Sequence, residues 1–335
     1  MRTTQSNAVP KVSAIIPTYK TTDCIVECLD SVFAQTYKDF EAIVVNDGSP
    51  DTIELEKVLG SYMERIVYIK QENKRAAGAR NTAIHHARGE FVAFLDSDDT
   101  WMPHHLAAQM QLFEHDPSLS LTYSNALVGM PGKEFEFMER CPSAGEATFE
   151  SLLLEQCQIP ISTVVARKEA ITRAGMFDEK LLRNDDYDMW VRTVFYGARI
   201  AYTEKVNAYM RIARPGSLSE SRAKMAEGSW AILEKLTRTL PLTDQARKVV
   251  EQRAAYYKAR YLLEEGKDKL DQHQFDQARR LLSEANDYFR KSKLSLALLG
   301  LSVAPGATFK LVSVWKRCAA GWRPKRDSNF PNPTG

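Results

Sequence analysis

The sequence predicts an α/β fold in which a parallel sheet is sandwiched between helices. Short apolar runs of strand length alternate with segments of helical periodicity four times within about 115 residues. The apolar runs are continuous rather than alternating, as is typical of strands that are buried on both faces. At 335 residues, the chain is long enough for one large domain and a smaller one.

The elements follow from this alternation in chain order. Strands are predicted at residues 12–16, 40–45, 66–69 and 91–95, and helices at residues 23–33, 52–63 and 76–87. The later part is less regular, with strands predicted at 119–128 and 161–166, a loop-rich insert at 130–146, helices at 168–174 and 183–192, and extended chain at 199–212. The regular part of the fold therefore ends near residue 119.

Composition narrows the classes of function. The 45 Lys and Arg nearly balance the 43 Asp and Glu, so no nucleic-acid partner is expected. Five scattered cysteines predict reduced thiols, and the six histidines are expected at the surface. No apolar core of signal-peptide length opens the chain, and no apolar run of about 18 residues occurs, so we expect a cytoplasmic protein without a spanning helix.

Polar clusters end three of the predicted strands. They are Pro17, Thr18 and Tyr19; Asp47, Gly48 and Ser49; and Asp96, Ser97, Asp98 and Asp99. Ligands of such sheets bind at the carboxyl ends of the strands, so this edge is the expected binding site. Neither the Gly-x-Gly-x-x-Gly nor the Walker-type glycine loop is present, which excludes an ordinary dinucleotide-binding domain and a P-loop enzyme.

The third cluster indicates a metal. Asp96 and Asp98 stand two residues apart on extended backbone and therefore point to one side. Carboxylates at the end of a buried strand need a positive partner, and a hard divalent cation binds through oxygens. The alternative is a solvated loop whose aspartates cap a helix opened by Pro103. Asp99 is interpreted as either a second ligand or a cap.

Five segments together resemble a family 2 glycosyltransferase with the GT-A fold, a mixed, mainly parallel sheet flanked by helices. They are VSAIIPTYK, SVFAQTY, FEAIVVNDGSPD, AGARNTAIHHARGEFVAFLDSDDTW and NDDYDMW. The resemblance covers about residues 10–219. It implies a nucleotide-sugar donor, Mn²⁺ or Mg²⁺, and displacement with inversion at the sugar carbon. It also implies that Asp98 binds the metal and that Asp96, which completes the expected metal site, lies beside the ribose.

The resemblance assigns the donor contacts as well. Asp47, beside Gly48 and Ser49, matches the residue that binds the base, although it could be only a turn residue. Pro17 and Tyr19, with Thr18 between them, match the wall of the base pocket, and Tyr19 could instead merely fill the edge. Arg80 matches an arginine that faces the diphosphate; outside this motif it would be interpreted as a surface charge. Arg214 stands where many relatives have a histidine, in a loop that resembles the one closing over the donor.

Inversion requires a base that takes the acceptor proton. Asp186 matches that base of the family, at the first turn of the helix at 183–192. Asp185 occupies the place of the usual glutamate. Asp188 is expected to orient or cap, and Trp190 to be core or the floor of the acceptor site.

The last third predicts two further regions. We expect a catalytic domain at 10–220, a helical region at 221–292 that resembles one tetratricopeptide-like hairpin, and an apolar and basic tail at 293–335 whose end is disordered. Residues 294–326 would be either a buried helix or an interfacial segment that contacts the inner face of the cell membrane.

The leading hypothesis is a non-processive transferase that moves one sugar, from a UDP-sugar in particular, to a saccharide or lipid-linked acceptor in surface polysaccharide or glycolipid synthesis. The alternatives are a catalytically silent nucleotide-sugar-binding protein and a scaffold that acts through its helical tail.

Overall fold

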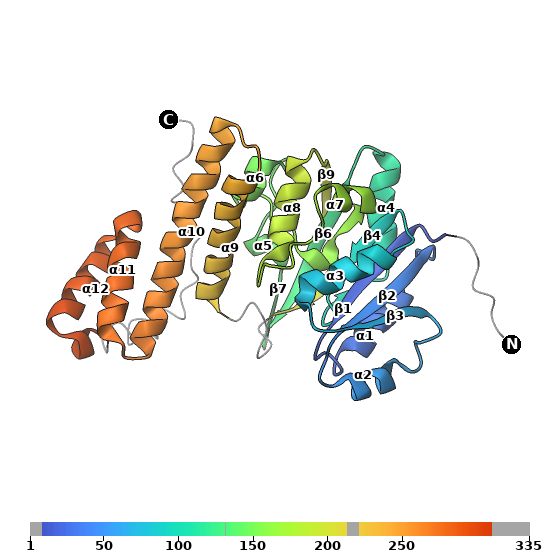
Figure 1. Ribbon diagram of the computed structural model, residues 1–335, viewed down its shortest axis with the longest axis horizontal. Helices are drawn as coiled ribbons and strands as arrows, with labels where there is room; N and C mark the ends of the chain where they lie inside the picture. The colour runs from blue at the N-terminus through green and yellow to red at the C-terminus, as the bar shows by residue number, and fades with distance from the viewer. Residues whose placement is uncertain (1–8, 131, 213–220, 310–335) are drawn as a thin grey trace. The chain divides into compact units, whose positions relative to one another are not determined.

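The computed structural model describes residues 9–130, 132–212 and 221–309. Its first part alternates strands and helices as predicted (Figure 1). These elements are β1 (Val12–Thr18), α1 (Ile25–Phe33), β2 (Phe40–Asp47), α2 (Thr52–Leu59), β3 (Ile66–Gln71), α3 (Arg75–His86) and β4 (Phe91–Phe94). The four strands pair in parallel in the order β3-β2-β1-β4. Their carboxyl ends therefore lie at one edge of the sheet.

The second part extends this sheet with antiparallel pairs. It comprises β5 (Thr100–Trp101), α4 (His105–His115), β6 (Leu121–Met130), β7 (Lys133–Glu136), α5 (Phe137–Arg140), α6 (Phe149–Leu153), η1 (Ile161–Thr163), β8 (Val165–Arg167), α7 (Lys168–Arg173), α8 (Asp185–Phe195) and β9 (Ile200–Arg211). The sheet continues as β4-β8-β6-β9-β5, and β7 pairs with β6. Only β6 and β9 pair in parallel here, so the described sheet is mixed.

Helices cover both faces of the sheet. Val12, Ala14 and Ile16 of β1 share one core with apolar residues of α1, α2 and α4. Helix α3 packs on β1 and β2. Because successive strand residues point to opposite faces, α3 takes the face toward which Ile15 points. The apolar runs of the sequence are continuous because both faces of these strands are buried.

Three expectations need correction. The insert at 130–146 contains β7 and α5 rather than loop alone. Helix α4 begins at His105 after His104, and no side chain caps it, so the aspartates do not cap that helix. His105 is fully buried and stacks on Trp101, with ring centroids 4.6 Å apart, rather than lying at the surface. Burial lowers its pKa to about 3, which keeps the ring neutral.

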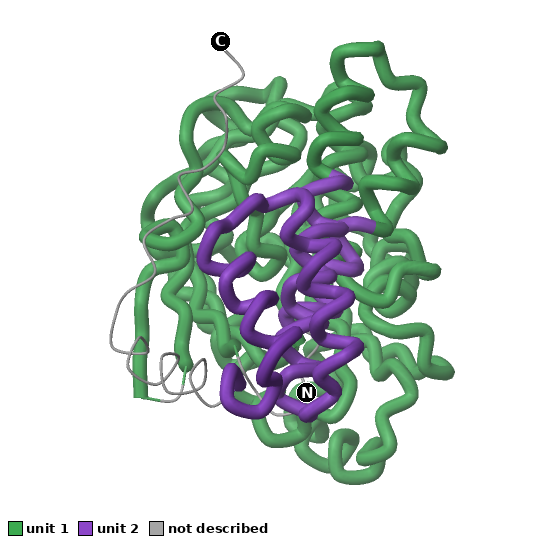
Figure 2. Tube along the Cα trace, turned by 90° about the vertical axis from the view of Figure 1, so that its left-hand side faces the viewer, with its two compact units in different colours: residues 1–221, 231–253 green, residues 222–230, 254–335 purple. Residues whose placement is uncertain are grey.

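The chain forms two compact units, which Figure 2 distinguishes by colour. Residues 1–221 and 231–253 form the unit with the sheet, and residues 222–230 and 254–335 form the other. The helical part consists of α9 (Arg222–Thr239), α10 (Asp244–Asp271), α11 (Phe275–Phe289) and α12 (Ser292–Val303). The helical region predicted at 221–292 is thus shared between the units.

The second unit has a small apolar core of its own. It is formed by Leu270, Ala278, Leu282 and Leu301. A Cβ at Gly266 would lie 2.8 Å from the Leu282 side chain, so the glycine permits the close approach of α10 and α11. Within the described ranges, no helix has both the length and the apolar character required to cross a bilayer.

Candidate active site

The acidic segment after β4 is held by bonds to two neighbouring elements. The Ser162 hydroxyl of η1 donates to Asp99 Oδ2 at 2.5 Å and accepts from the Asp96 backbone N–H at 3.2 Å. Arg211 of β9 donates its backbone N–H to Asp99 Oδ1 at 2.9 Å. Burial, with Asp98 and Asp96 nearby, raises the pKa of Asp99 well above its usual range. Asp99 therefore fixes the shape of the segment, while Asp96 and Asp98 remain partly exposed.

A cysteine lies beneath this segment. Cys28 of α1 is fully buried, and its Sγ lies 3.9 Å from the Asp96 carbonyl oxygen. Burial, followed by the charges of Asp99 and its neighbours, raises the pKa of the Cys28 thiol well above its ordinary value. The thiol is therefore protonated at neutral pH.

Arg80 joins the β4 end to the start of α8. Its guanidinium is buried and donates to Asp96 Oδ1 and to Asp185 Oδ2, each at 2.6 Å. Burial alone lowers the pKa of Arg80, but the carboxylates of Asp96 and Asp185 outweigh it, and the net shift is upward. The arginine lies on α3, so three elements converge here. This bridge places the predicted base near the predicted donor edge.

Asp186 lies next to this bridge, in the first turn of α8. Asn184, in the left-handed conformation with φ 55°, precedes the helix, and Asp186 accepts the Tyr187 backbone N–H at 2.8 Å. Burial and the neighbouring Asp185 raise the pKa of Asp186 to about 6, against the opposing effect of Arg80. A carboxylate with this pKa is ionised at neutral pH and is a stronger base than an ordinary aspartate.

A buried ion network fixes the rest of α8. Asp188 has no exposed surface, and its carboxylate accepts from Arg192 Nε at 2.8 Å and from Lys235 Nζ at 2.8 Å. Lys235 also pairs with Asp178 at 2.7 Å. Trp190 is core, since its ring contacts Phe94 and Phe177. Asp188 thus orients the helix that carries Asp186, as one of its predicted roles states.

Asp47 stabilises the turn between β3 and α3. Its Oδ1 accepts from Gln71 Nε2 at 2.7 Å and from the Lys74 backbone N–H at 2.8 Å. Gly48 has φ 64°, and a Cβ there would lie 2.8 Å from the Asn73 backbone nitrogen. The Asp47 carboxylate thus holds the β3–α3 turn and not the turn at Gly48 that was the alternative for it, and the base contact of Asp47 stays a prediction.

The end of β1 meets the end of β2. Ser49 accepts the Lys20 backbone N–H at 2.8 Å, and Thr18 shares a hydrogen bond of 3.1 Å with Thr21. Thr21 in turn receives a hydrogen bond from Ser97 at 3.0 Å, which connects this edge to the acidic segment. Tyr19 is exposed at this edge.

The predicted closing loop begins at Arg211. Its Nη1 donates to the Asp98 carbonyl at 3.1 Å and its Nη2 to Glu27 at 2.5 Å, so the start of the loop is attached to the acidic segment. Arg214 lies outside the described residues.

The carboxylates at the end of β4 suit a metal ion that binds together with the substrate. Among the described residues, no group of three or more His, Cys, Asp and Glu side chains is arranged to hold a metal. Asp96 and Asp98 offer carboxylate oxygens, and Asp96 also bonds Arg80. Mg²⁺ and similar ions are commonly held by one or two carboxylates together with substrate phosphates, so the residues present fit such an ion.

Several of these contacts have no signal in the sequence. Ser162 lies in a stretch predicted only as a strand, and Lys235 lies in a helix that carries many other charges. Arg80, Asp96 and Asp186 were predicted site residues, but the pairing of Arg80 with Asp185 was not predicted. Asp99 was expected as a ligand or a cap, and neither role describes its bonds to Ser162 and Arg211.

The fold resembles that of solved glycosyltransferases of the GT-A class. TarS residues 1–349 of S. aureus in complex with UDP-GlcNAc superposes with a TM-score of 0.61 at 18% identity, over 92% of each chain. The mannosyltransferase PcManGT from Pyrobaculum calidifontis, in complex with GDP-Man and Mn²⁺, gives a TM-score of 0.60 at 20% identity, over 94% of this chain and 85% of that one. These similarities concern the fold.

Sequence comparison identifies the family. The model of glycosyl transferase family 2 matches residues 13–171. WfaP of Escherichia coli, a UDP-Glc:alpha-D-GlcNAc-diphosphoundecaprenol beta-1,3-glucosyltransferase, is 32% identical over 216 residues, which are 64% of this chain and 81% of its own. The amylovoran biosynthesis glycosyltransferase AmsB of Erwinia amylovora is 30% identical over 250 residues, 71% of this chain and 82% of its own. The chain belongs to glycosyltransferase family 2, and it is a glycosyltransferase.

Proposed function

We propose that this enzyme is metal-dependent and inverting, and that it transfers one sugar from a UDP-sugar to a saccharide or lipid-linked acceptor in surface polysaccharide or glycolipid synthesis. The observation that carries this proposal is the position of Asp186. Its pKa is raised to about 6, and it lies beside the bridge that Arg80 makes between Asp185 and Asp96. A proton acceptor thus lies beside a strand end with carboxylates for a cation.

In the proposed reaction, Asp186 takes the proton of the acceptor hydroxyl as the hydroxyl oxygen bonds to the anomeric carbon of the donor. The bond from that carbon to the diphosphate oxygen breaks on the opposite face, and its electron pair leaves with the nucleoside diphosphate. Configuration at the carbon is therefore inverted. Held by Asp98 and Asp96, Mn²⁺ or Mg²⁺ would neutralise the charge that develops on the diphosphate.

The remaining predicted residues would bind the donor. Asp47 would bind the base and Tyr19 would stack on it, with Pro17, Thr18, Gly48 and Ser49 forming the adjoining backbone. Arg80 and Arg214 would contact the diphosphate. Arg80 already bonds two carboxylates, so we propose that it also positions Asp185 and Asp96 for the reaction.

The comparisons support the choice of donor and acceptor. WfaP is named for UDP-Glc and for a diphosphoundecaprenol-linked acceptor, and TarS was solved with UDP-GlcNAc. PcManGT was solved with GDP-Man and Mn²⁺, so GDP-sugars belong in the same test. We further propose a cytoplasmic enzyme that contacts the inner face of the cell membrane through residues 294–326.

The test is metal-dependent release of nucleoside diphosphate from UDP-, GDP- and TDP-sugars, preceded by a thermal-shift screen of each donor with Mn²⁺ or Mg²⁺. We expect a UDP-sugar to stabilise the protein and to be hydrolysed slowly, and Asp186→Asn to retain donor binding while losing turnover. Donor binding without turnover in the unaltered protein would instead favour a silent binding module, and no donor binding at all would refute both.

A further inference from the structure

Helix α12 presents an apolar stripe to solvent. Its inward residues Leu294, Leu298 and Leu301 pack in the small core of the second unit. Leu296, Leu299 and Val303 are 71%, 63% and 79% exposed. The spacing of three and seven residues places them on one side of the helix. Three large apolar side chains on one exposed stripe indicate a surface that another apolar phase covers.

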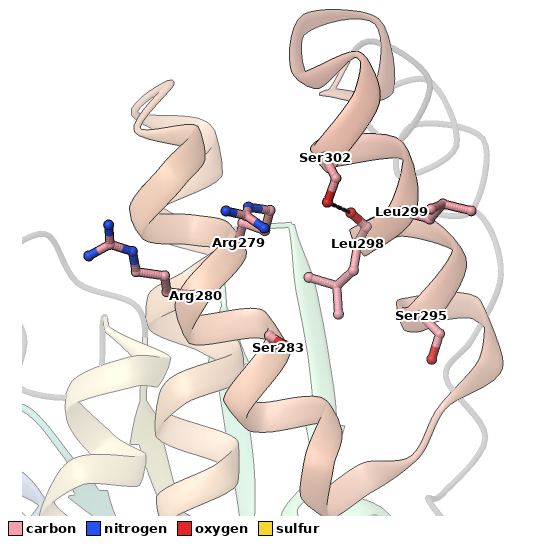
Figure 3. Close-up of a pocket in the computed structure, with 7 residues that line it drawn as sticks. All are labelled: Arg279, Arg280, Ser283, Ser295, Leu298, Leu299 and Ser302. Carbon is pink, nitrogen blue, oxygen red and sulfur yellow. Dashed lines mark hydrogen bonds between the residues drawn. The ribbon is translucent and has the colours of Figure 1, made fainter.

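A groove between α11 and α12 borders this stripe (Figure 3). It has a volume of about 430 Å³ and is lined by Arg279, Arg280, Ser283, Ser295, Leu298, Leu299 and Ser302. No carboxylate lines it, and within the described ranges neither arginine has an ion-pair partner. Guanidinium and hydroxyl groups donate hydrogen bonds to phosphate oxygens. Leu299, which points away from α11 in Figure 3, belongs to both the groove and the stripe.

The charge of the chain is unevenly distributed. Residues 288–335 contain nine of the 45 Lys and Arg but only one of the 43 Asp and Glu, a formal net charge of +8. Residues 1–287 therefore carry −6, although the whole chain is near neutral. Lys291 and Lys293 precede or begin α12 itself. An asymmetry of this size indicates an anionic partner for this end of the chain.

We propose that α12 binds the surface of an anionic phospholipid bilayer. Leu296, Leu299 and Val303 enter the boundary between headgroups and acyl chains, and the groove at Arg279 and Arg280 receives a lipid phosphate. This inference rests on the proposed function, because a lipid-linked acceptor is presented at such a surface. It specifies the helix face, the phosphate site and the sign of the lipid charge.

Two other occupants of the stripe are less compatible with the charges. A second copy of the chain would bring two segments of charge +8 together. Residues 310–335, with six Lys and Arg and one Asp, would be repelled by Arg279 and Arg280. An anionic bilayer is attracted by these groups and also buries the apolar side chains.

The test is sedimentation of the full-length protein with vesicles of phosphatidylcholine, alone or with about one third phosphatidylglycerol. We expect binding to the anionic vesicles only, weakened by salt. Leu296→Ser, Leu299→Ser and Val303→Ser together, or Arg279→Gln with Arg280→Gln, should each lower the affinity about tenfold or more. Matched controls on the other unit are Ile53→Ser, at an 81% exposed residue, and Arg173→Gln, and they should bind as the unaltered protein does.

Wild-type affinity in both sets of variants, or equal binding to neutral vesicles, overturns the proposal. Loss of a dimer in the serine variant, with no vesicle binding by the unaltered chain, assigns the stripe to a second copy instead. Should the serine variant fail to fold, as judged by thermal unfolding, the arginine variant decides. Donor hydrolysis is measured on the unaltered protein and on every variant. Retained hydrolysis by an unaltered protein that binds no vesicles therefore refutes only this inference and not the proposed function.

Discussion

Asp186 is an ionisable group whose surroundings disfavour its charge. Its carboxylate is partly buried beside Asp185, and Arg80 only partly compensates. The ordinary pKa near 3.8 is raised to about 6 as a result. The same perturbation has two consequences, one for the rate of transfer and one for stability.

The first consequence is a pH dependence of activity. Because the base must be ionised to accept a proton, kcat/KM should rise tenfold per pH unit below about 6 and level off above it. Initial rates of donor turnover between pH 4.5 and 8 check this. A profile that levels off near pH 4 would mean that another group is the base.

The second consequence appears in Asp186→Asn. In the wild type, the raised folded pKa means that stability is lost as the pH rises from about 4 through 6. The amide has no charge to bury, so the variant should be more stable above pH 6, on the order of 2 kcal/mol, and no more stable below pH 4. Turnover should fall by roughly 10²–10⁴. Urea unfolding of the wild type and the variant at pH 4 and pH 8 tests this difference. If the two proteins are equally stable at both pH values, the prediction is contradicted.

At the scale of single residues, the sequence predicts the candidate site residues better than it predicts the side-chain contacts between them. Asp96, Arg80 and Asp186 stand in recognisable motifs, so their presence at one edge of the sheet could be predicted. The bond from Arg80 to Asp185 could not, because it joins residues 105 positions apart and depends on how α3 and α8 pack. Likewise, nothing in the sequence distinguishes Ser162 from any other serine.

Among the elements, α8 is the one whose placement matters most for the base. Its buried Asp188 bonds Arg192 of the same helix and Lys235 of α9, and these bonds fix the position of α8. The acidic segment is held similarly by η1 and by the end of β9. Both arrangements connect the proposed site residues to elements distant in sequence.

Lys235→Met should destabilise the protein by about 1–3 kcal/mol, because it leaves the buried Asp188 with one cation instead of two. It should also lower kcat more than it raises the KM for the donor, because the position of α8 sets that of Asp186. Lys267→Met, at a more exposed pair with Glu264, is the control and should change stability by less than about 0.5 kcal/mol. Equal effects of the two substitutions would contradict the role of Lys235.

Ser162→Ala tests the other attachment. The hydroxyl serves both Asp99 and the Asp96 N–H, so its loss should cost about 1–3 kcal/mol and raise the KM for the donor. Thermal unfolding and donor kinetics measure the two effects. Thr163 lies next to it, and its hydroxyl donates to the Pro160 carbonyl at 2.8 Å rather than to the acidic segment. Thr163→Val should therefore leave the donor KM unchanged and serves as the control.

For the whole molecule, the sequence predicted the parallel half of the sheet well and the antiparallel half poorly. Strands β1 to β4 are continuous apolar runs with regular spacing, and their order follows from helical crossovers. Strands β5 and β7 are short, and their pairing depends on partners distant in the chain, so local pattern did not reveal them. Local pattern also did not show that residues 231–253 belong to the unit with the sheet.

The metal is expected to be necessary for turnover but not for folding. Because no described group of three or more ligands could hold an ion, EDTA should abolish donor turnover and leave the melting temperature unchanged in the absence of donor. Mn²⁺ or Mg²⁺ should restore turnover and should raise the melting temperature only together with the nucleotide, through binding to the folded state. A melting temperature that falls in EDTA alone would indicate a structural metal.

The thiol of Cys28, enclosed beneath the Asp96 carbonyl, offers a way to observe this edge of the sheet in solution. Alkylating reagents attack thiolates, and here both enclosure and the raised pKa suppress that form. Modification of Cys28 therefore requires local opening of the acidic segment, which exposes the thiol to water. The labelling rate of Cys28, followed by mass spectrometry, therefore measures how often the acidic segment opens. A bound nucleotide that stabilises the closed segment should slow the labelling.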